Sequence, residues 1–557
     1  MDMLWSGWGD PARATPLPAA AVELLRDLLG VRPPKVPPVA LESIEVPPSR
    51  LPGAAADALA GVVGAGGLRT DAETRIRHTR GKSTPDLLRV RAGDVSDAPD
   101  AVVLPGTHEE VLGVLGVCAE HLVTVIPFGG GTSVVGGLAP PRAGSGSSRA
   151  GDRPRIALDL RRLDRLLAVD PLSRTATLQP GLRAPRAEEL LREHGLTLGH
   201  YPQSYEWATV GGFAAARSSG QASTGYGRFD DMVVALTVAT PEGTLELGRA
   251  PKSAAGPDLR QLVLGSEGAF GVITSVTVRV RPAPETAVYD GWRFPAFAEG
   301  TAALRTLAQD GPLPTVLRLA DETETMVGLA RAHESGGPAA GPEAGGCLAI
   351  VGFEGVAGDV ASRRAAAGAV LRTFGGEPLG GGPGESWARG RFAAPYLRDA
   401  LLDVGAFAET LETAAFWSGI PALYAAVREA LTGSLAPAAG AGPHGTGHGA
   451  GRPLVMCHIS HVYPAGASLY FTVLSAGGDD AVARWARAKG AVNDAIIAAG
   501  GTISHHHGVG TDHRDWYARE IGPLGVEVLR AVKDRLDPAG ILNPGVLVPD
   551  HPPAPGR

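Results

Sequence analysis

Three adjacent imidazoles stand in the SHHHGVG segment at positions 504–510. A histidine side chain has a pKa close to working pH, so each of the three can accept or donate a proton during a reaction. Successive side chains of an extended loop face opposite sides, which predicts that His505 and His507 share one face and that His506 takes the other. A purely structural role for one or two of them is the alternative. The segment favours an acid–base site.

A metal site is the competing interpretation of the same segment. No carboxylate or cysteine lies at ligand spacing beside the three histidines. The three cysteines, Cys118, Cys347 and Cys457, are too widely spaced for a structural zinc site or a disulfide framework. We therefore predict no metal and a reducing compartment. Other histidines stand in loop-like sequence and are expected to be solvated: His444, His448 and His513.

A glycine-rich stretch, Pro127 to Ser133, follows the strand-like run LVTVIPF. Glycine has no Cβ, so consecutive glycines let backbone N–H groups approach an anion closely, and the hydroxyls of Thr132 and Ser133 add donors. The GxGxxG spacing of a Rossmann dinucleotide site is absent. By itself the stretch fits an anion cradle or a plain strand connection.

Two further segments rich in small residues follow, one from Thr209 to Gly220 and one from Gly265 to Ile273. The three segments in this order resemble the FAD-binding domain of the vanillyl-alcohol oxidase and p-cresol methylhydroxylase superfamily. The resemblance implies FAD held by Pro127, Phe128, Gly129, Gly130, Gly131, Thr132, Ser133, Gln203, Ser204, Thr209, Gly211, Gly212, Ala216, Arg217, Ser218, Ser219, Glu267, Gly268, Gly271, Val272 and Ile273. The glycine-rich loop has no histidine, which excludes a covalent flavin link there, so non-covalent FAD is expected.

The histidine segment narrows the resemblance to the alkyldihydroxyacetonephosphate synthase (alkylglycerone-phosphate synthase) family. Further matches are WSGWG at 5–9, YLRD at 396–399 and ASLYF at 467–471, so the similarity spans nearly the whole chain. The resemblance implies that Arg398 binds the substrate phosphate. It also implies that Tyr470 assists proton transfer at the carbon next to the carbonyl, with His505, His506 and His507 as acid–base partners.

The family's reaction replaces the fatty acid of acyl-dihydroxyacetone phosphate by a fatty alcohol, with covalent flavin participation and no net redox change. The chain departs from the family pattern after GVG, where Thr511 and Asp512 replace a basic residue. An FAD-dependent oxidoreductase acting on a 2-hydroxy acid or an alcohol therefore stays open, as does a flavin-holding protein without catalysis.

Short β-branched runs alternate with helical patterns in the first half of the chain, which predicts a mixed fold rather than an all-helical one. Thr107 and Glu110 form a capping-box pattern that predicts a helix over 109–121. We expect an α+β fold: an N-terminal region (1–95), a two-subdomain FAD-binding domain of the p-cresol methylhydroxylase type (96–284), an α+β cap over the substrate (285–490) and a C-terminal segment (491–557) that returns to the flavin. Gly/Pro-rich tracts near 140–154, 334–346, 375–385 and 434–453 read as surface insertions.

A formal net charge of −7 gives no electrostatic footprint for nucleic acid. The first residues lack a signal-peptide pattern, and no apolar run is long enough to cross a bilayer, so a cytoplasmic protein is expected. Peripheral contact with a membrane stays open because the implied substrates are amphiphilic. A homodimer also stays open, since family members are often dimers.

Overall fold

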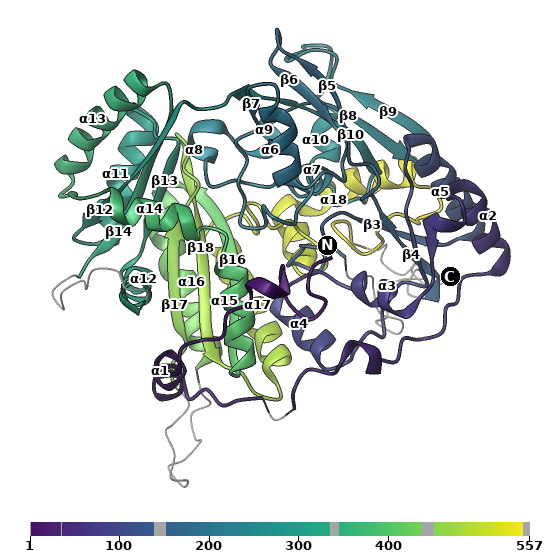
Figure 1. Ribbon diagram of the computed structural model, residues 1–557, viewed down its shortest axis with the longest axis horizontal. Coiled ribbons are helices and arrows are strands. Elements are labelled where there is room, and N and C mark those ends of the chain that lie inside the picture. The colour runs from purple at the N-terminus through teal and green to yellow at the C-terminus, as the bar shows by residue number, and fades with distance from the viewer. Residues whose placement is uncertain (1, 35, 139–151, 335–344, 437–450, 550–557) are drawn as a thin grey trace.

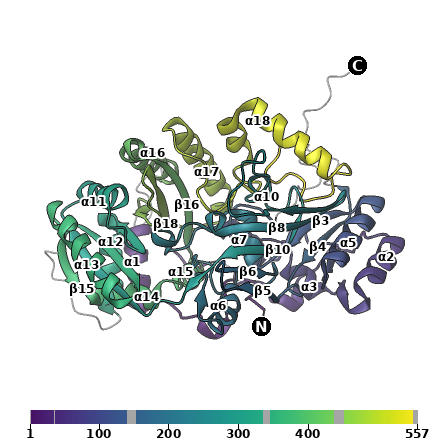
Figure 2. The same cartoon turned by 90° about the horizontal axis from the view of Figure 1, so that it is seen from above.

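The computed structural model describes residues 2–34, 36–138, 152–334, 345–436 and 451–549. Two lobes lie side by side, and both views separate them (Figures 1 and 2). The first lobe holds the sheets formed before residue 284, and the second holds a single large sheet.

The first sheet of the first lobe has the order β1-β2-β4-β3, and β2, β4 and β3 run parallel. Its strands are β1 (Leu68–Arg69), β2 (Ala101–Val103), β3 (Thr124–Phe128) and β4 (Arg155–Asp159). Helices α2 (Gly53–Val63) and α5 (His108–His121) pack on this sheet, and Leu59, Leu115 and Ile156 are fully buried between them.

The predicted start of α5 is confirmed with one change of partner. The Thr107 hydroxyl accepts the N–H of Glu110 at 3.1 Å, as a capping box requires. The Glu110 carboxylate instead accepts the N–H of Gly106 at 2.6 Å, one residue earlier than that pattern predicts.

The second sheet of the first lobe is antiparallel, with the order β5-β6-β10-β8-β9. Its strands are β5 (Leu166–Asp170), β6 (Thr175–Leu178), β8 (Val233–Thr240), β9 (Gly243–Leu247) and β10 (Val272–Arg279). Strands β7 (Leu196–Thr197) and β11 (Arg281–Pro282) form a separate two-stranded antiparallel sheet. Helix α6 (Ala184–Arg192) and helix α7 (Val210–Ala216) bury their apolar side chains in the core of this sheet.

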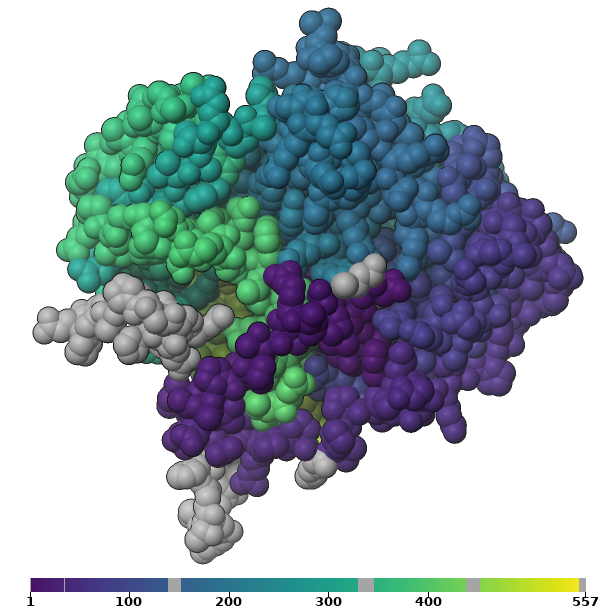
Figure 3. Space-filling model, in the orientation of Figure 1, coloured from purple at the N-terminus to yellow at the C-terminus, as the bar shows by residue number. Residues whose placement is uncertain are grey.

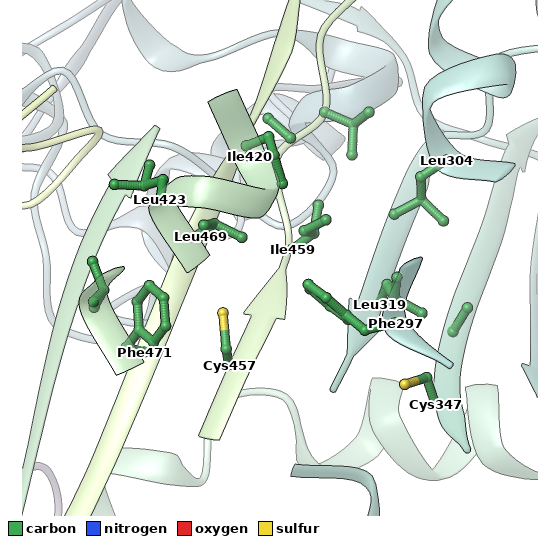
Figure 4. Close-up of a cluster of buried hydrophobic side chains, with 14 of the residues drawn as sticks. Phe297, Leu304, Leu319, Cys347, Ile420, Leu423, Cys457, Ile459, Leu469 and Phe471 are labelled. Carbon is green, nitrogen blue, oxygen red and sulfur yellow. The ribbon is translucent and has the colours of Figure 1, made fainter. Parts of the chain in front are cut away.

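The second lobe is one antiparallel sheet of seven strands, in the order β15-β12-β14-β13-β17-β18-β16. Its strands are β12 (Thr286–Phe294), β13 (Val316–Ala320), β14 (Cys347–Gly355), β15 (Glu377–Gly380), β16 (Ala406–Phe416), β17 (Leu454–Ile459) and β18 (Gly466–Ala476). The main core lies between this sheet and α11 (Phe297–Asp310), α13 (Ala357–Thr373), α16 (Ile420–Leu435) and α17 (Ala481–Ala498). Figure 4 shows side chains such as Leu319, Cys457 and Phe471 meeting there.

The remaining helices connect or flank these sheets. They are α1 (Ala19–Leu29), α3 (Ala72–Arg77), α4 (Thr84–Arg91), α8 (Ser223–Tyr226), α9 (Phe229–Met232), α10 (Arg260–Val263), α12 (Glu322–Glu334), α14 (Gly381–Gly390), α15 (Ala394–Asp403) and α18 (Arg514–Leu536). Short 3-10 turns span Pro11–Arg13, Leu41–Ser43, Ala65–Gly67 and Trp417–Gly419. Within the described ranges, no helix is long and apolar enough to span a bilayer.

The predicted α+β fold, with two subdomains and a cap, is confirmed. The C-terminal segment returns to the first lobe, because Leu542 bridges to Val125 of β3 and Ile541 is buried in that core. The expectation of a loop insertion at 375–385 is wrong: these residues form edge strand β15 and the start of α14. The other three tracts lie mostly outside the described residues, and the domain boundaries stay predictions.

Candidate active site

A buried carboxylate organises the histidine loop. The pairing of β16 with β18 places Glu412 directly opposite Tyr470. The Glu412 carboxylate accepts the Ser504 hydroxyl at 2.7 Å and three consecutive backbone N–H groups, those of residues 505–507, at 2.6, 3.1 and 2.8 Å. Burial would raise the pKa of Glu412, but the neighbouring imidazoles and these N–H donors outweigh it and hold that pKa well below the usual range. Glu412 is therefore a fixed anion under the loop.

The three imidazoles form one contiguous cluster. Nδ1 of His505 lies 3.0 Å from Nδ1 of His506, and the rings of His506 and His507 have centroids 4.8 Å apart. The Tyr470 ring lies 6.0 Å from the His506 ring and nearly parallel to it. The prediction of an extended loop with alternating faces is wrong, because convergence of three N–H groups on one carboxylate bends the backbone.

The protonation states of the side chains in this cluster suit proton transfer. Burial lowers the pKa of all three imidazoles, that of His507 to about 3, so they are neutral at pH 7 and can accept protons. Burial raises the pKa of Tyr470 to about 12, so its hydroxyl keeps its proton. The cluster pairs a phenol donor with imidazole acceptors.

A fourth imidazole, His461, was not identified from the sequence. It follows β17, is 4% exposed, and stacks on His505 with ring centroids 5.0 Å apart. Its Nδ1 lies 3.0 Å from the Ser219 hydroxyl and 2.7 Å from the Ser223 hydroxyl. Ring nitrogens of His461, His505 and His506 lie within 4.8 Å of one another, so three neutral imidazoles also approach metal-ligand spacing. The absence of a metal stays a prediction.

A charged chain reaches Tyr470 from its other side. His458 of β17 stacks on the Tyr470 ring at 4.8 Å, and its Nδ1 lies 2.9 Å from the Glu324 carboxylate. Arg318 of β13 contacts both His458 and Glu324. Burial opposes ionisation of Glu324, but His458 and Arg318 outweigh it and lower its pKa to about 2. The sequence signal for this group was the HISH run at 458–461, which begins inside β17 and continues past its end.

His513 corrects another expectation. It is 3% exposed rather than solvated, and its Nδ1 lies 3.1 Å from the carbonyl oxygen of Gly508. It therefore supports the turn after the histidines. His444 and His448 lie outside the described residues.

The three glycine-bearing segments come together around this loop. A Cβ on Gly130 would stand 2.1 Å from the carbonyl oxygen of Trp207, so only glycine lets the first segment pack against the residues that lead into the second. The Glu267 carboxylate of the third segment accepts the N–H groups of Val509 and Gly510 at 2.9 and 2.8 Å. Burial raises the pKa of Glu267 to about 7 despite these donors. Glu267 thus ties the predicted cofactor segments to the histidine loop.

These segments fit a large polar cofactor. Gly129, Gly130, Thr132 and Ser133 keep part of their surface exposed although the elements around them are buried. In the stretch 200–224, which contains several predicted cofactor residues, four buried polar atoms have no hydrogen-bond partner: Nδ1 of His200, Nε2 of Gln203, Oε1 of Gln221 and Oγ1 of Thr224. Buried polar atoms normally have partners, so these atoms fit a ligand rich in donors and acceptors, as FAD is.

Several predicted cofactor residues use their side chains for packing or for contacts within the protein. Arg217 donates to the carbonyl oxygens of Leu264 and Gln261. Val272 and Ile273 are almost fully buried in hydrophobic cores. Only their backbones remain for a cofactor, and their assignment stays a prediction.

Arg398, the predicted phosphate ligand, lies on α15. Its Nε and Nη2 donate to the Asp399 carboxylate at 3.2 and 3.1 Å, and its Nη1 donates to the carbonyl oxygen of Lys82. The guanidinium is therefore paired within the protein, and its role toward the substrate stays a prediction.

Two family models match the chain. An FAD-binding domain matches residues 99–248, and the C-terminal domain of FAD-linked oxidases matches residues 283–547. The first range contains the first two cofactor segments, and the second contains the cap and the histidine loop.

Similar proteins and solved structures assign the chain to one family among the FAD-linked enzymes. The chain is 35% identical to an alkyldihydroxyacetonephosphate synthase of Dictyostelium discoideum, over 86% of this chain and 78% of that protein. It is 33% identical to one of Trypanosoma brucei brucei, over 87% and 79%. A mitochondrial D-lactate dehydrogenase (cytochrome) of Arabidopsis thaliana is 26% identical, over 81% and 74%.

A solved alkyldihydroxyacetonephosphate synthase structure superposes with a TM-score of 0.79 at 29% identity, covering 98% of each chain. A p-cresol methylhydroxylase structure shares the fold, with a TM-score of 0.67 at 17% identity over 91% of this chain and 99% of that one. This FAD-dependent chain therefore belongs to the alkyldihydroxyacetonephosphate synthase family.

Proposed function

We propose that this protein exchanges the acyl chain of acyl-dihydroxyacetone phosphate for a fatty alcohol, which makes an ether-lipid precursor without net redox change. The observation that carries the proposal is the buried cluster of Tyr470 and the three loop histidines, assembled over Glu412 beside the cofactor segments. Membership of the synthase family supports the same activity.

The side chains supply proton transfer and orientation. Bound FAD supplies electrophilic chemistry with no net change in its oxidation state. A neutral imidazole of the loop accepts the proton removed from the carbon next to the substrate carbonyl, because burial keeps all three rings unprotonated. The Tyr470 hydroxyl, protonated at working pH, donates a hydrogen bond to the reacting oxygen. The buried setting excludes water, which would otherwise compete with the alcohol.

The exchange balances without an oxidant. The bond between the substrate carbon and the acyl oxygen breaks, and the fatty acid leaves as a carboxylate with that electron pair. A new bond forms between the same carbon and the oxygen of the alcohol, whose hydroxyl proton is released. The proton first held on the imidazole returns to the carbon, so the histidine loop ends each cycle neutral.

The test is to mix the purified flavoprotein anaerobically with palmitoyl-dihydroxyacetone phosphate and hexadecanol, while flavin absorbance and ether product are followed. We expect alkyl-dihydroxyacetone phosphate by mass spectrometry without net flavin reduction. Tyr470→Phe and His506→Gln should lower kcat by about 10²- to 10⁴-fold, as loss of an acid–base group does. Tyr424→Phe is the matched control. Tyr424 is also a partly buried tyrosine, but its hydroxyl donates to Asp321, just before α12, and not to the histidine cluster.

A flavin oxidoreductase is the second candidate, favoured by the similarity to a D-lactate dehydrogenase and by neutral imidazoles that could also deprotonate a 2-hydroxy acid. Bleaching of the flavin by a 2-hydroxy acid, with no ether product from the lipid substrates, would establish this activity and exclude the synthase.

We also propose that the protein works in the cytoplasm, meets its lipid substrates at a membrane surface and forms a homodimer. The amphiphilic substrates support contact with a membrane surface. Sedimentation with phosphatidylcholine vesicles tests membrane contact, and a protein that stays in the supernatant contradicts it. Light scattering after gel filtration tests the homodimer, and a monomeric mass contradicts it.

A further inference from the structure

Arg391 is a cation that the proposed mechanism does not use. It follows α14, in the turn that leads to α15, and faces the first lobe. Its guanidinium carbon lies 4.7 Å from the ring centroid of Tyr201, 5.0 Å from that of Phe392 and 5.8 Å from that of Trp387. Aromatic faces on several sides hold the guanidinium plane in place.

The Arg391 guanidinium has no anion within the described part of the chain. Its Nε and Nη1 are buried and make no hydrogen bond. The nearby Glu354 carboxylate is already engaged by the hydroxyls of Tyr226 and Tyr289, each at 2.6 Å. A desolvated, unpaired guanidinium is unfavourable, so the arrangement calls for an anionic ligand. Arg398 differs, because Asp399 neutralises it.

A short chain of contacts links Arg391 to the catalytic cluster. Gln221 donates from Nε2 to the carbonyl oxygen of Arg391 at 3.2 Å. Gln221 stands between Ser219 and Ser223, whose hydroxyls both contact His461. Residues 219–223 thus connect Arg391 to the imidazole cluster.

A neutral donor lies near Tyr201 in the sequence. The Nε2 of Gln203 is buried without a partner, two residues after Tyr201, whose ring packs under Arg391. An anion over the guanidinium would offer acceptors to such a donor. The site therefore combines a planar cationic fork with a neutral amide donor, which suits the oxygens of a phosphate or a carboxylate.

We propose that Arg391 binds an oxyanion of the substrate, beside the imidazole cluster. This inference rests on the proposed function, in which the substrate carries a phosphate and releases a carboxylate. Arg391 anchors one of these two groups, and its fork geometry orients the reacting carbon toward Tyr470.

Calorimetric titration of the holoenzyme separates the two sources without turnover. Glycerol 3-phosphate probes the phosphate and palmitate probes the carboxylate. In Arg391→Gln we expect one of the two to bind about tenfold to hundredfold more weakly, as loss of charged hydrogen bonds predicts. Weaker glycerol 3-phosphate assigns the phosphate, and weaker palmitate assigns the leaving group.

Steady-state kinetics give the second readout. Arg391→Gln should raise the KM for palmitoyl-dihydroxyacetone phosphate and leave the KM for hexadecanol unchanged, while Arg391→Lys, which keeps the charge without the fork, should fall between. Arg372→Gln is the matched control: Arg372 also lies over an aromatic ring, Trp292 at 5.3 Å, but is exposed on α13.

Unchanged binding of both anions by Arg391→Gln and Arg391→Lys overturns the inference. So does a loss of FAD with unaltered anion binding once FAD is restored, because Arg391 would then serve the cofactor. If the wild-type protein makes no ether product but its anion binding depends on Arg391, the proposed function fails and the anion site stands.

Discussion

At the scale of single residues, Glu412 shows how one carboxylate can shape a catalytic loop. It accepts four hydrogen bonds from Ser504 and from the backbone of residues 505–507, and it is 2% exposed. All of these hydrogen bonds go to the histidine loop, so Glu412 acts as a positioning residue. Its effect on catalysis acts through the placement of the imidazoles.

Glu412→Gln should lower kcat by about 10²-fold with little change in KM or FAD content. The amide has one acceptor oxygen, and its NH₂ would face backbone donors, so the loop would shift by a fraction of an ångström to relieve the clash. Steady-state kinetics measure kcat and KM, and the flavin spectrum measures the FAD content.

Glu409→Gln is the control for Glu412→Gln. Glu409 lies on the same strand and is buried, but it accepts the N–H of Thr84 at the start of α4. It should lower the thermal midpoint and spare kcat. If the two variants lose kcat alike, Glu412 has no special role in placing the histidines.

His200 predicts how stability depends on pH. It is 1% exposed, and burial lowers its pKa to about 3, with further repulsion from His506 and Arg228. Below the unfolded pKa of about 6.5 the unfolded chain binds a proton that the folded chain does not. The free energy of unfolding should therefore fall as pH drops from about 6.5 toward 3, by at most about 1.4 kcal/mol per pH unit from this residue.

His200→Gln removes this titration, so its thermal midpoint should depend less steeply on pH between about 6.5 and 4 than that of the wild type. Glutamine can keep a hydrogen bond to Ser218, the partner of His200 at 3.0 Å. Parallel curves for the two proteins would show that His200 titrates alike in both states.

At the scale of elements, the pairing of β16 with β18 sets the site. Eleven residue pairs fix the register, so Glu412 and Tyr470 cannot shift relative to each other without moving the whole ladder. Tyr470 also pairs with His458 across β18 and β17. Three neighbouring strands thus present the groups that surround the tyrosine ring.

Helix α5 allows a direct test of its predicted cap. Thr107→Ala should lower the thermal midpoint by an amount that corresponds to about 1 kcal/mol, because the N–H of Glu110 loses its acceptor. Thr107→Ser keeps the hydroxyl and should remain close to wild type. Equal midpoints for the alanine and serine variants would show that the hydroxyl contributes nothing.

At the scale of the whole molecule, the N-terminal segment joins the two lobes. Figure 3 shows the first residues lying across the face between the lobes. Lys82 of the first lobe donates to the carbonyl oxygen of Trp5 at 3.2 Å, and Asp399 of the second accepts the N–H of Trp8. Lys82 is 9% exposed, and this burial lowers its pKa to about 7.

Gly9→Ala should loosen this junction. Gly9 has a φ of +71°, and a Cβ there would stand 2.2 Å from the Tyr396 hydroxyl. We expect a lower thermal midpoint and faster proteolysis near the N-terminus. Gly53→Ala is the matched control, since a Cβ at the first residue of α2 meets nothing within 4 Å. Equal protease sensitivity of the two variants would contradict a clamping role for the segment.

The sequence by itself indicated the fold class, and it predicted the cofactor segments and an acid–base role for the histidine loop. Each depends on local chemistry: the glycines between 127 and 137, the alternation in strands such as 233–240, and the Thr107 cap are all properties of neighbouring residues. The return of the C-terminal segment was predicted as well, and its residues Ile541, Leu542 and Val546 are buried against the first lobe.

Only the tertiary structure decided which distant residues complete the site. Glu412 carries no local signature of function, and the HISH run does not tell what His458 and His461 contact. Their contacts arise from strand register and from packing between the lobes. The bent shape of the histidine loop has the same origin, since an extended and a bent backbone are locally equivalent until a buried carboxylate satisfies three N–H groups at once. Long-range hydrogen bonding and burial choose between such states, and neither can be read from neighbouring residues alone.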